Sequence, residues 1–202
     1  MIIDPQTTDV FNFYKVMIGS IVPRPIAFVS TVSSDGVLNL APFSFFTAAS
    51  ANPPVIVFCP MRRESGDLRK DTLRNITINK EFVVNVVSEE FARKMNMTSG
   101  EYPPEVNEFD LAGLTPVPSD LIKPPRVGEA HVQMECRLFL WIEIGDAPLS
   151  GNVVLGEVLR IHVDDAYFDN YKIDPDKLRP IGRMGGNAYS RTTDRFDMIR
   201  PK

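Results

Sequence analysis

Small polar side chains stand among three phenylalanines in the segment NLAPFSFFTAAS, residues 39–50. The polar residues are Asn39, Ser44, Thr47 and Ser50. Buried hydroxyls and amides need hydrogen-bond partners, and the proline of the segment cannot donate to a sheet ladder. A planar ligand that carries a polyhydroxyl chain would explain the pattern. The alternative is that small polar residues fill a tight corner of a barrel.

A second segment, MRRESGDLRKDT (residues 61–72), is rich in basic side chains. Arg62 and Lys70 are among four cations that directly precede a predicted helix start at Asp71 or Thr72. A helix N-terminus offers free N–H groups and the positive end of a dipole, so this arrangement suits a phosphate. A solvated charged turn is the alternative. Taken together, the two segments fit FMN.

The remaining reactive residue types favour no other chemistry. His131 and His162 stand alone, without a Cys/His cluster at metal-ligand spacing, so we expect no metal site. Cys59 and Cys136 lie far apart in apolar surroundings and are interpreted as buried thiols. The sequence contains no GxSxG nucleophile motif, and the glycine-rich stretch 181–186 does not follow a strand and open a helix. We therefore name no catalytic acid, base or nucleophile.

Composition is that of an ordinary soluble globular protein. The chain has 202 residues, 44% of them hydrophobic and 24% charged, with a net charge of −4 and a pI near 5.3. This charge argues against a nucleic-acid binder but leaves room for a local basic pocket. The apolar runs are too short to span a membrane, and the start MIIDPQTTD lacks the regions of a signal peptide. We expect a cytoplasmic location.

Short strands separated by turns must position the polar residues. The patterns predict helices over 9–20, from 71 or 72 onward and over 89–97, a hairpin turn over 33–36, and strands over 26–32, 55–60, 82–87, 130–143 and 153–164. In the strand 130–143, the even-numbered residues form an apolar face, and the odd-numbered face mixes charged and aromatic side chains, which suggests partial cover by a partner or ligand.

The overall pattern favours an all-antiparallel architecture. Strands outnumber helices and no βαβ rhythm appears, so we predict a mainly β fold, an antiparallel barrel with a few short helices outside it. The chain shows no clear linker and is expected to form a single domain over 1–202. The proline-rich stretch 99–126 is predicted to be a long functional or interfacial loop, and the tail 167–202 to be irregular.

Eight short motifs in a fixed order resemble one known family. They are VPRPIAFVST, DG, NLAPFSFF, SANPP, KDTLRNI, FVVN, GEVLRIHVDD and RPIGRMGGNAYS. Together they resemble the flavin reductase-like family of the FMN-binding split-barrel superfamily, in particular the branch with flavoredoxin and the reductase components of two-component monooxygenases. The resemblance extends from about residue 21 to residue 189.

The resemblance implies a homodimer of six-stranded split barrels with FMN bound non-covalently near the interface. Loop 99–126 and tail 167–202 would pack on the barrel or on the partner. Arg24, within PRPIA, would be a family feature, and one interpretation gives it a structural role. Ser50, Lys70, Asp71 and Thr72 would hold the phosphate, with Arg62 as an addition. The full set implied for the cofactor is Thr31, Asn39, Ala41, Pro42, Phe43, Ser44, Phe45, Thr47, Ser50, Arg62, Lys70, Asp71, Thr72 and Tyr189.

Three functions follow from the resemblance. The first is an oxidoreductase in which NADH or NADPH reduces bound flavin, which then reduces free flavin, a partner protein such as a monooxygenase, or a small acceptor. The second is an electron-transfer or flavin-storage protein that oxidises NAD(P)H poorly. The third, a relative that binds another cofactor such as haem, is disfavoured because the chain has only two histidines.

Overall fold

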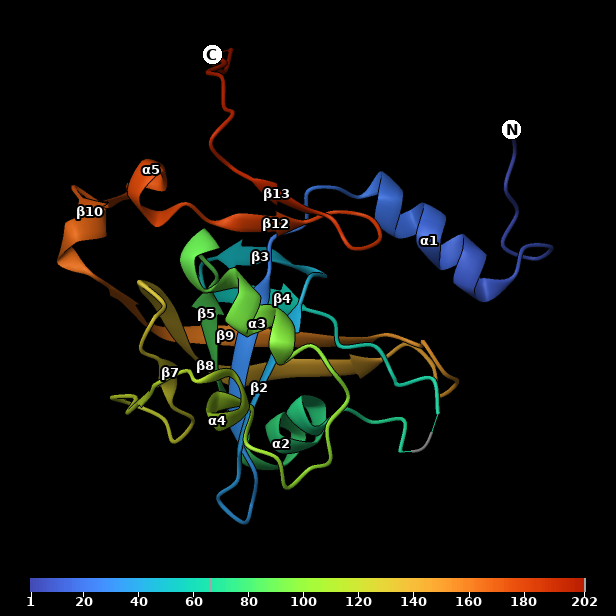
Figure 1. Cartoon of the computed structure of the whole chain (residues 1–202), viewed down its shortest axis with the longest axis horizontal. Coiled ribbons are helices and arrows are strands. Elements are labelled where there is room, and N and C mark those ends of the chain that lie inside the picture. The colour runs from blue at the N-terminus through green and yellow to red at the C-terminus, as the bar shows by residue number, and fades with distance from the viewer. Residues whose placement is uncertain (66, 202) are drawn as a thin grey trace.

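One seven-stranded antiparallel sheet organises the computed structural model, which describes residues 1–65 and 67–201 (Figure 1). Its strand order is β2-β1-β5-β8-β9-β4-β3, and every neighbouring pair is antiparallel. The strands are β1 Ala27–Val32, β2 Leu38–Phe43, β3 Phe46–Ala51, β4 Pro54–Phe58, β5 Glu81–Val86, β8 Val132–Glu143 and β9 Asn152–Val163.

The two edge strands of this sheet are consecutive in sequence. β2 ends at Phe43 and β3 begins at Phe46, so only Ser44 and Phe45 separate the two ends of the strand order. The sheet must therefore curl until its edges approach each other, as in a barrel. The predicted mainly β antiparallel class is confirmed. The sheet has seven strands where six were expected.

The hairpin turn between β1 and β2 forms where the sequence predicts it. Gly36 adopts a φ of +86°, and the Ser33 hydroxyl accepts hydrogen bonds from the backbone N–H groups of Asp35 and Val37. The turn sets a register in which Thr31 pairs with Asn39 and Phe28 pairs with Pro42. Two of the predicted site residues are thus placed side by side by local turn chemistry.

In the described residues, five α-helices and two short 3-10 helices surround the sheet. They are α1 Val10–Ser20, α2 Asp71–Asn79, η1 Glu89–Phe91, α3 Ala92–Met97, α4 Glu108–Ala112, η2 Asp165–Tyr167 and α5 Pro175–Leu178. Asp9 caps α1 by accepting from the N–H groups of Phe11 and Asn12. α1 has no buried residue and lies at the periphery (Figure 1). None of the described helices is long and apolar enough to cross a membrane.

The core consists of two apolar clusters on opposite faces of β1. Phe28 belongs to the cluster that includes Phe91 of η1 and Phe109 of α4. Its neighbour Val29 belongs to the cluster that includes Leu73 of α2 and Phe82 of β5. Successive side chains of a strand point to opposite faces, so β1 is buried on both sides, and helices α2 and α4 cover different parts of the same sheet.

Strand β8 departs from the predicted faces after its midpoint. Register shifts interrupt its pairing with β9 between Glu135 and Cys136 and between Leu138 and Leu140. A bulge places two residues opposite one, so the alternation changes phase. Trp141 consequently packs against the core cluster of α2, while Leu140 and Ile142 are exposed. The prediction that these two residues continue the apolar face is wrong.

Two regions contain more regular structure than the sequence indicated. The stretch 99–126 holds α4 and the start of a small two-stranded sheet, β6 Pro116–Val117 and β7 Arg126–Val127. The tail holds β10 Phe168–Asp169, β11 Lys172–Ile173, α5, and a hairpin of β12 Ile181–Arg183 and β13 Tyr189–Arg191. The prediction of an irregular tail is wrong, because these elements are too short for periodicity to reveal them.

Candidate functional site

A continuous cleft runs from the start of α2, along the end of β2 and past α3, to the β12–β13 hairpin. It consists of an inner pocket of about 40 Å³, a middle pocket of about 140 Å³ and an outer chamber of about 930 Å³. Pro42 and Ser99 line both the inner and the middle pocket. Asn96, Arg183 and Tyr189 line both the middle pocket and the outer chamber.

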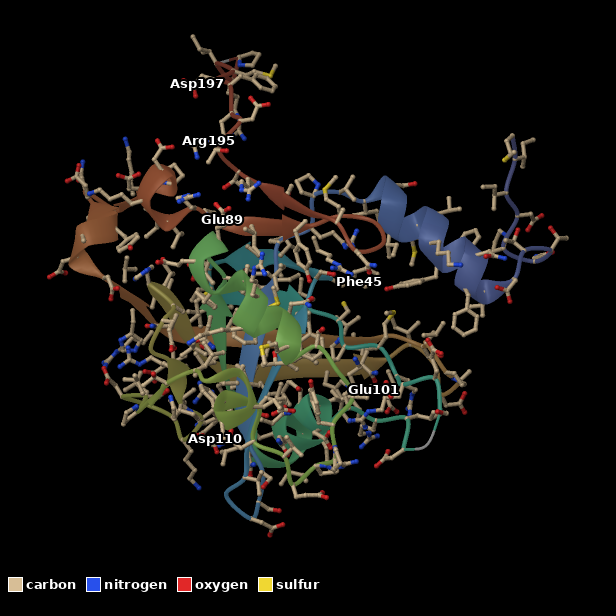
Figure 2. The ribbon with its side chains drawn as sticks, in the orientation of Figure 1. Phe45, Glu89, Glu101, Asp110, Arg195 and Asp197 are labelled. Carbon is tan, nitrogen blue, oxygen red and sulfur yellow. The ribbon has the colours of Figure 1, made fainter. Side chains whose placement is uncertain are left out.

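The lining brings together distant parts of the sequence. The inner pocket is lined by Asn39, Ala41, Pro42, Arg63, Lys70, Asp71, Thr72, Thr98, Ser99, Gly100, Glu101, Tyr102 and Glu108. Figure 2 labels Glu101, which lines the inner pocket, and Glu89, which lines the outer chamber near the hairpin. The two segments that suggested a ligand from sequence, 39–50 and 61–72, therefore meet in one place.

Lys70 occupies the inner pocket as a half-buried cation. It is the N-cap residue of α2, and its Nζ lies 5.9 Å from the centre of the Phe43 ring. Burial lowers the pKa of Lys70, and the nearby Arg63 lowers it further, while Glu101 opposes the shift. Its ammonium has no hydrogen-bond acceptor among residues 1–65 and 67–201. An anion in the pocket would supply the missing partner.

Two arginines hold the side chain of Asp71. Its carboxylate accepts from Arg63 and from Arg74, each at 2.6 Å. Arg63 also donates to the backbone oxygens of Asp67 and Arg69 and so braces the loop before α2. The Asp71 side chain is therefore engaged within the protein. What it leaves available at the first turn of α2 is its backbone N–H.

The structure does not bring Arg62 to the cleft. Its guanidinium donates to Glu143 at 3.0 Å and to the backbone oxygen of Gly145 at 3.1 Å. The adjacent Arg63 lines the inner pocket instead. A basic run gives no information on which of two neighbouring arginines turns inward, so the sequence could not distinguish them.

A buried hydrogen-bond network forms the wall behind the inner pocket. The Asn39 side-chain oxygen accepts from Thr72 at 2.8 Å and from Thr31 at 3.2 Å. The Asn39 amide donates to Glu108 at 3.0 Å, and Asn75 donates to Thr31. Each polar group is satisfied within the network, which fixes the orientation of Asn39 and Thr72. Thr31 is fully buried and does not line the pocket.

Glu108 is a site residue that the sequence reading missed. Its second carboxylate oxygen accepts the N–H of Leu40 at 3.0 Å. Burial raises the pKa of Glu108, the nearby Asp71 adds to the increase, and the hydrogen bonds from Leu40 and Asn39 oppose it. Segment 98–102, which also lines the inner pocket, was predicted only as part of a long loop. The length of that loop was the one signal that it carries function.

Of the other residues in segment 39–50, some line the cleft and others lie outside it. Ala41, Pro42 and Ser44 line the inner or middle pocket. Phe43 packs into the core against Phe58, with ring centres 5.3 Å apart. Phe45 lies beneath the Arg24 guanidinium at 5.9 Å.

Thr47 and Ser50 lie on the edge strand β3 and are exposed, and neither lines any of the three pockets. Since β3 is paired on only one side in the sheet, another chain or a ligand can approach this edge.

Tyr189 stands where the middle pocket opens into the outer chamber. Its hydroxyl donates to Asn96 at 3.0 Å, and the guanidinium of Arg183 lies over its ring at 4.5 Å. The tail thus brings Tyr189 toward the same cleft as segment 39–50, as the resemblance implied. Arg93 and Arg191 also line this end and were not singled out from sequence.

Arg24 joins the tail and α1 to the cleft wall. It donates to the backbone oxygens of Ile18 and Ile21 at the end of α1, and to that of Met184 in the tail. Its Nε donates to the Ser44 hydroxyl at 3.4 Å. Burial lowers the pKa of Arg24. The side chain is almost fully buried, so we assign it a positioning role.

The two histidines take part in separate clusters. His131 bonds to Asp164 at 2.7 Å and to Glu90 at 2.8 Å. Its ring stacks on Tyr167, with centres 4.0 Å apart. Burial pulls the pKa of His131 down, but the hydrogen bonds to Asp164 and Glu90 outweigh it, so that the pKa is raised. His131 is thus a hydrogen-bonded, largely covered histidine near the surface.

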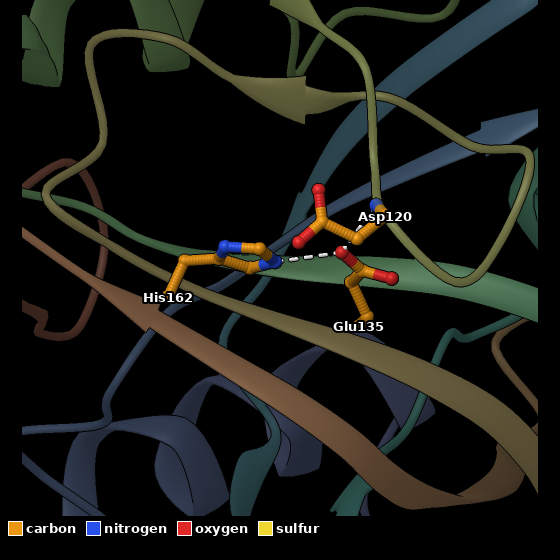
Figure 3. Close-up of side chains that lie close together, drawn as sticks. All are labelled: Asp120, Glu135 and His162. Atoms are coloured by element: carbon orange, nitrogen blue, oxygen red, sulfur yellow. Dashed lines mark hydrogen bonds and ion pairs between the residues drawn. The ribbon is translucent and has the colours of Figure 1, made fainter.

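His162 is less isolated than its position in the sequence indicated, because it lies close to Asp120 and Glu135 (Figure 3). One Glu135 oxygen accepts from His162 at 2.6 Å and from the Asp120 N–H at 2.8 Å, and the other accepts from the Leu121 N–H at 2.8 Å. These N–H donors already satisfy the buried carboxylate. We interpret the cluster as an anchor for the loop that covers β8.

The two cysteines are free thiols. Cys136 is fully buried, and Cys59 is half-buried. Burial raises the pKa of both, so neither is activated as a nucleophile. The described residues thus offer a cleft with a cation, helix N–H groups and fixed polar walls. These features bind and orient a ligand.

Residues 18–179 match the family model of the flavin reductase like domain. The chain belongs to the flavin reductase-like family. Membership implies that flavin is a bound cofactor or a substrate, and it places the chain among oxidoreductases. The resemblance inferred from the motifs is confirmed.

Three solved structures are similar to the chain. Nitrilotriacetate monooxygenase component B from Bacillus cereus is 38% identical, covers 98% of each chain and has a TM-score of 0.92. The 2-nitrobenzoate 2-nitroreductase NbaA from Pseudomonas fluorescens is 31% identical over 100% of this chain and 96% of that one, with a TM-score of 0.90. A protein of Shewanella frigidimarina described with a split barrel domain is 20% identical over the whole of both chains, with a TM-score of 0.85, and shows the fold.

Proposed function

We propose that the protein is an FMN-binding oxidoreductase that takes electrons from NADH or NADPH. The observation that carries this proposal is Lys70, a half-buried ammonium at the start of α2 without an acceptor in the described chain. A buried cation without a partner is costly. A ligand phosphate at the helix N-terminus would supply the missing counter-charge.

Lys70 and the first turn of α2 are the proposed phosphate site. The first N–H groups of a helix have no acceptor within it, so those of Asp71 and Thr72 can donate to phosphate oxygens. Arg63, which lines the same pocket, takes the place that we had expected for Arg62. The hydroxyl of Thr72 donates to Asn39, so its contribution is to hold the pocket wall.

The middle pocket is the proposed place of the flavin ring. Ala41, Pro42 and Ser44 would contact the ring edge and the ribityl chain, and Tyr189 would approach from the tail. Thr31 and Asn39 would act through the network behind the wall, and Phe43 and Phe45 through packing. Thr47 and Ser50 stay proposed contacts on the exposed edge of β3, where a second copy of the chain would complete the site.

Bound FMN would supply the hydride and electron chemistry. The protein's residues would bind it, orient it and limit access of water, and no side chain need act as a nucleophile. The electron acceptor is a free flavin, a monooxygenase partner or a small molecule. Similarity to nitrilotriacetate monooxygenase component B favours a monooxygenase partner as the acceptor. Similarity to a nitroreductase favours a small molecule as the acceptor. The alternative is an electron-transfer or flavin-storage protein, as the flavoredoxin resemblance suggests.

A homodimer and a cytoplasmic location belong to the same proposal. Exposed apolar side chains on α1 include Phe11, Val16 and Met17, and Phe139 is exposed on β8. Exposed apolar side chains on one short helix, as on α1, are a feature of interaction surfaces. Light scattering should report about twice the monomer mass. A monomer that binds FMN fully would contradict an interface site.

The decisive experiment is spectroscopic. Purified protein mixed with FMN should show a flavin absorption spectrum shifted from that of free FMN, with quenched fluorescence. Under anaerobic conditions, NADH or NADPH should bleach it at a rate far above that of free FMN. A protein that leaves FMN fluorescence unchanged at micromolar concentrations contradicts FMN binding. Binding without bleaching would favour the electron-transfer alternative.

A further inference from the structure

The hydrogen bonds behind the inner pocket form a chain with a defined direction. Glu108 of α4 lies at one end, Thr72 of α2 lies at the other, and Asn39 of β2 lies between them. Glu108 and Thr72 are 7% and 1% exposed, and all three residues line the inner pocket. The chain therefore joins a buried carboxyl group to a hydroxyl at the proposed phosphate site.

The charge of Glu108 determines the direction of this chain. An ionised carboxylate can only accept hydrogen bonds. Its two oxygens face the backbone N–H of Leu40 and the side chain of Asn39, each at 3.0 Å. Asn39 must therefore turn its amide nitrogen to Glu108 and its oxygen to Thr72, whose hydroxyl lies 2.8 Å away. In this state the Thr72 proton points at Asn39 and is not available to a ligand.

A proton on Glu108 would reverse the chain. The backbone N–H of Leu40 can only donate, so the proton must stay on the carboxyl oxygen that faces Asn39. That O–H would donate to the Asn39 oxygen once the amide has turned over, and the amide nitrogen would then donate to the Thr72 hydroxyl. Thr31, the second partner of Asn39 at 3.2 Å, can follow, because a hydroxyl both donates and accepts.

Reversal of the chain would release the Thr72 proton. Since the hydroxyl is buried, its proton needs a new acceptor. Thr72 lines the inner pocket together with Lys70, so a phosphate oxygen bound there would supply that acceptor. Protonation at one end of the chain thus creates a phosphate donor at the other.

The surroundings of Glu108 favour its protonated form. Burial raises the pKa of Glu108, and the nearby Asp71 carboxylate adds to the increase, while the hydrogen bonds that the carboxylate accepts oppose it. The other charged residues that line the inner pocket are Arg63, Lys70 and Glu101. A phosphate in the pocket would add negative charge near the carboxyl group and so favour protonation further.

We propose that Glu108 is a positioning residue whose protonation reverses the chain through Asn39 and lets the Thr72 hydroxyl donate to the FMN phosphate. Phosphate binding and the uptake of one proton by Glu108 then favour each other, as thermodynamic linkage requires. The inference rests on the proposed function, because it takes the inner pocket as the phosphate site. It makes the affinity for FMN, but not for riboflavin, depend on the charge of Glu108.

A double-mutant cycle separates this chain from simple repulsion between Glu108 and the phosphate. Glu108→Gln copies the protonated state, because the glutamine oxygen must face the Leu40 N–H and its amide nitrogen then donates to Asn39. Thr72→Val removes the hydroxyl at the far end. Glu101→Gln is the matched control, since it removes a carboxylate from the lining of the same pocket but outside the chain. Fluorescence titrations at pH 8 give the FMN and riboflavin dissociation constants of wild type, single and double variants.

We expect Glu108→Gln to strengthen FMN binding about tenfold more when residue 72 is threonine than when it is valine, since one charge-assisted bond is gained. Glu101→Gln should have the same effect in both backgrounds, and riboflavin should show no coupling. Equal effects of Glu108→Gln in both backgrounds would overturn the proposal and leave only repulsion.

A pH series without any change at residue 108 gives the same test if Glu108→Gln disturbs folding. Lowering the pH from 8 to 5 should strengthen FMN binding more in wild type than in Thr72→Val, because only the wild type has a hydroxyl to release. Titration of the FMN phosphate itself affects both proteins alike. Identical pH profiles for the two proteins would contradict the chain.

Ligand-free protein distinguishes failure of this inference from failure of the proposed function. The NMR signals of the Asn39 side-chain amide are identified by their loss in Asn39→Ser. As the pH falls, nuclear Overhauser contacts of these amide protons should change from Glu108 to the Thr72 methyl group, and in Glu108→Gln they should favour Thr72 at every pH. This change in a protein that binds no FMN would support the chain and contradict the proposed function. FMN binding with an amide that never turns over would overturn the chain alone.

Discussion

The ammonium of Lys70 lies 5.9 Å from the centre of the Phe43 ring. This contact joins the two segments that sequence alone identified, because Lys70 is the N-cap residue of α2 and Phe43 ends β2. The Phe43 ring in turn packs against Phe58 in the core. The Lys70 ammonium therefore lies near an aromatic ring whose position is fixed by packing in the core. It lines a pocket together with other polar groups.

Replacing Lys70 with alanine should weaken FMN binding selectively. One charge-assisted hydrogen bond contributes roughly 1.5–3 kcal/mol, so the FMN dissociation constant should rise about 10- to 100-fold. Riboflavin should lose far less, because it has no phosphate. Fluorescence titrations with both flavins measure the difference. Arg69→Ala is the control, since Arg69 pairs with Glu143 outside the cleft. An equal loss for both flavins would mean that Lys70 does not bind the phosphate.

The same residue should cost stability when no ligand is present. Burial lowers the pKa of Lys70, so the folded state holds this proton less tightly than the unfolded state. This loss of unfolding free energy is fully present when the pH lies below the pKa of Lys70 in the folded state. It disappears as the pH rises toward the pKa of lysine in the unfolded state, near 10.4. Lys70→Met should therefore stabilise FMN-free protein at pH 7 by about 1 kcal/mol, or roughly 2–4 °C in Tm. With saturating FMN the wild type should melt higher. A variant that is less stable without FMN contradicts this account.

Glu135 should contribute stability that acid removes. Burial pushes its pKa up, but the hydrogen bonds from Asp120, His162 and Leu121 outweigh it, so the pKa is lowered. A lowered carboxyl pKa gives stability above the unfolded value of about 4.3, and this is lost as pH falls through the folded pKa. Glu135→Gln should cost about 3 kcal/mol at pH 7 and less at pH 3.

Urea unfolding between pH 3 and pH 7 measures the loss. Glu157→Gln is the control, because Glu157 is partly exposed and pairs with the exposed Arg137. That variant should change the unfolding free energy by less than about 1 kcal/mol. If Glu135→Gln and Glu157→Gln give the same small effect at every pH, the Glu135 cluster does not anchor the loop.

The sequence predicted those elements whose local signals are strong. The strands β1, β5 and β9 follow from apolar patterning and turn residues. Helix α2 begins at Asp71, one of the two predicted start residues, but its N-cap is Lys70, which makes no side-chain cap hydrogen bond. The mainly β class followed from strands that outnumber the helices and from the absence of a βαβ rhythm. What the sequence could not supply were features that depend on long-range pairing. The register shifts between β8 and β9 expose Leu140 and turn the half-buried Trp141 toward the core.

Prediction of the candidate site had a similar limit. Four predicted residues line the cleft, namely Asn39, Pro42, Lys70 and Tyr189. The sequence could identify them because each belongs to one of the motifs that carry the family resemblance. The inward turn of Arg63 in place of Arg62, and the burial of Glu108 beneath β2, depend on how α4 and the loop before α2 pack. Helix α4 has only five residues, too few for a periodic signal, so its carboxylate could not be placed from sequence.

The close approach of Gly156 to Phe82 gives a final prediction about the barrel core. A Cβ atom on Gly156 would lie 2.3 Å from the Cζ atom of Phe82. The Phe82 side chain is fully buried and packs against Phe58 with the two rings tilted. Gly156 also pairs with Ile56 and Leu138 within the sheet, so its backbone cannot move aside. Gly156→Ala should therefore destabilise the fold by about 1–3 kcal/mol through overpacking.

Gly19→Ala is the matched control for this variant, because nothing lies within 4 Å of the Cβ position of Gly19. Alanine in helix α1 should stabilise the protein by roughly 0.5–1 kcal/mol. Chemical denaturation followed by tryptophan fluorescence compares the two. The double variant Gly156→Ala/Phe82→Leu should recover part of the loss, since the smaller side chain removes the clash. A Gly156→Ala protein as stable as the wild type would mean that Phe82 can shift without cost. In that case the chain of rings from Phe82 through Phe58 and Phe43 would not be the rigid support for Lys70 that the packing indicates.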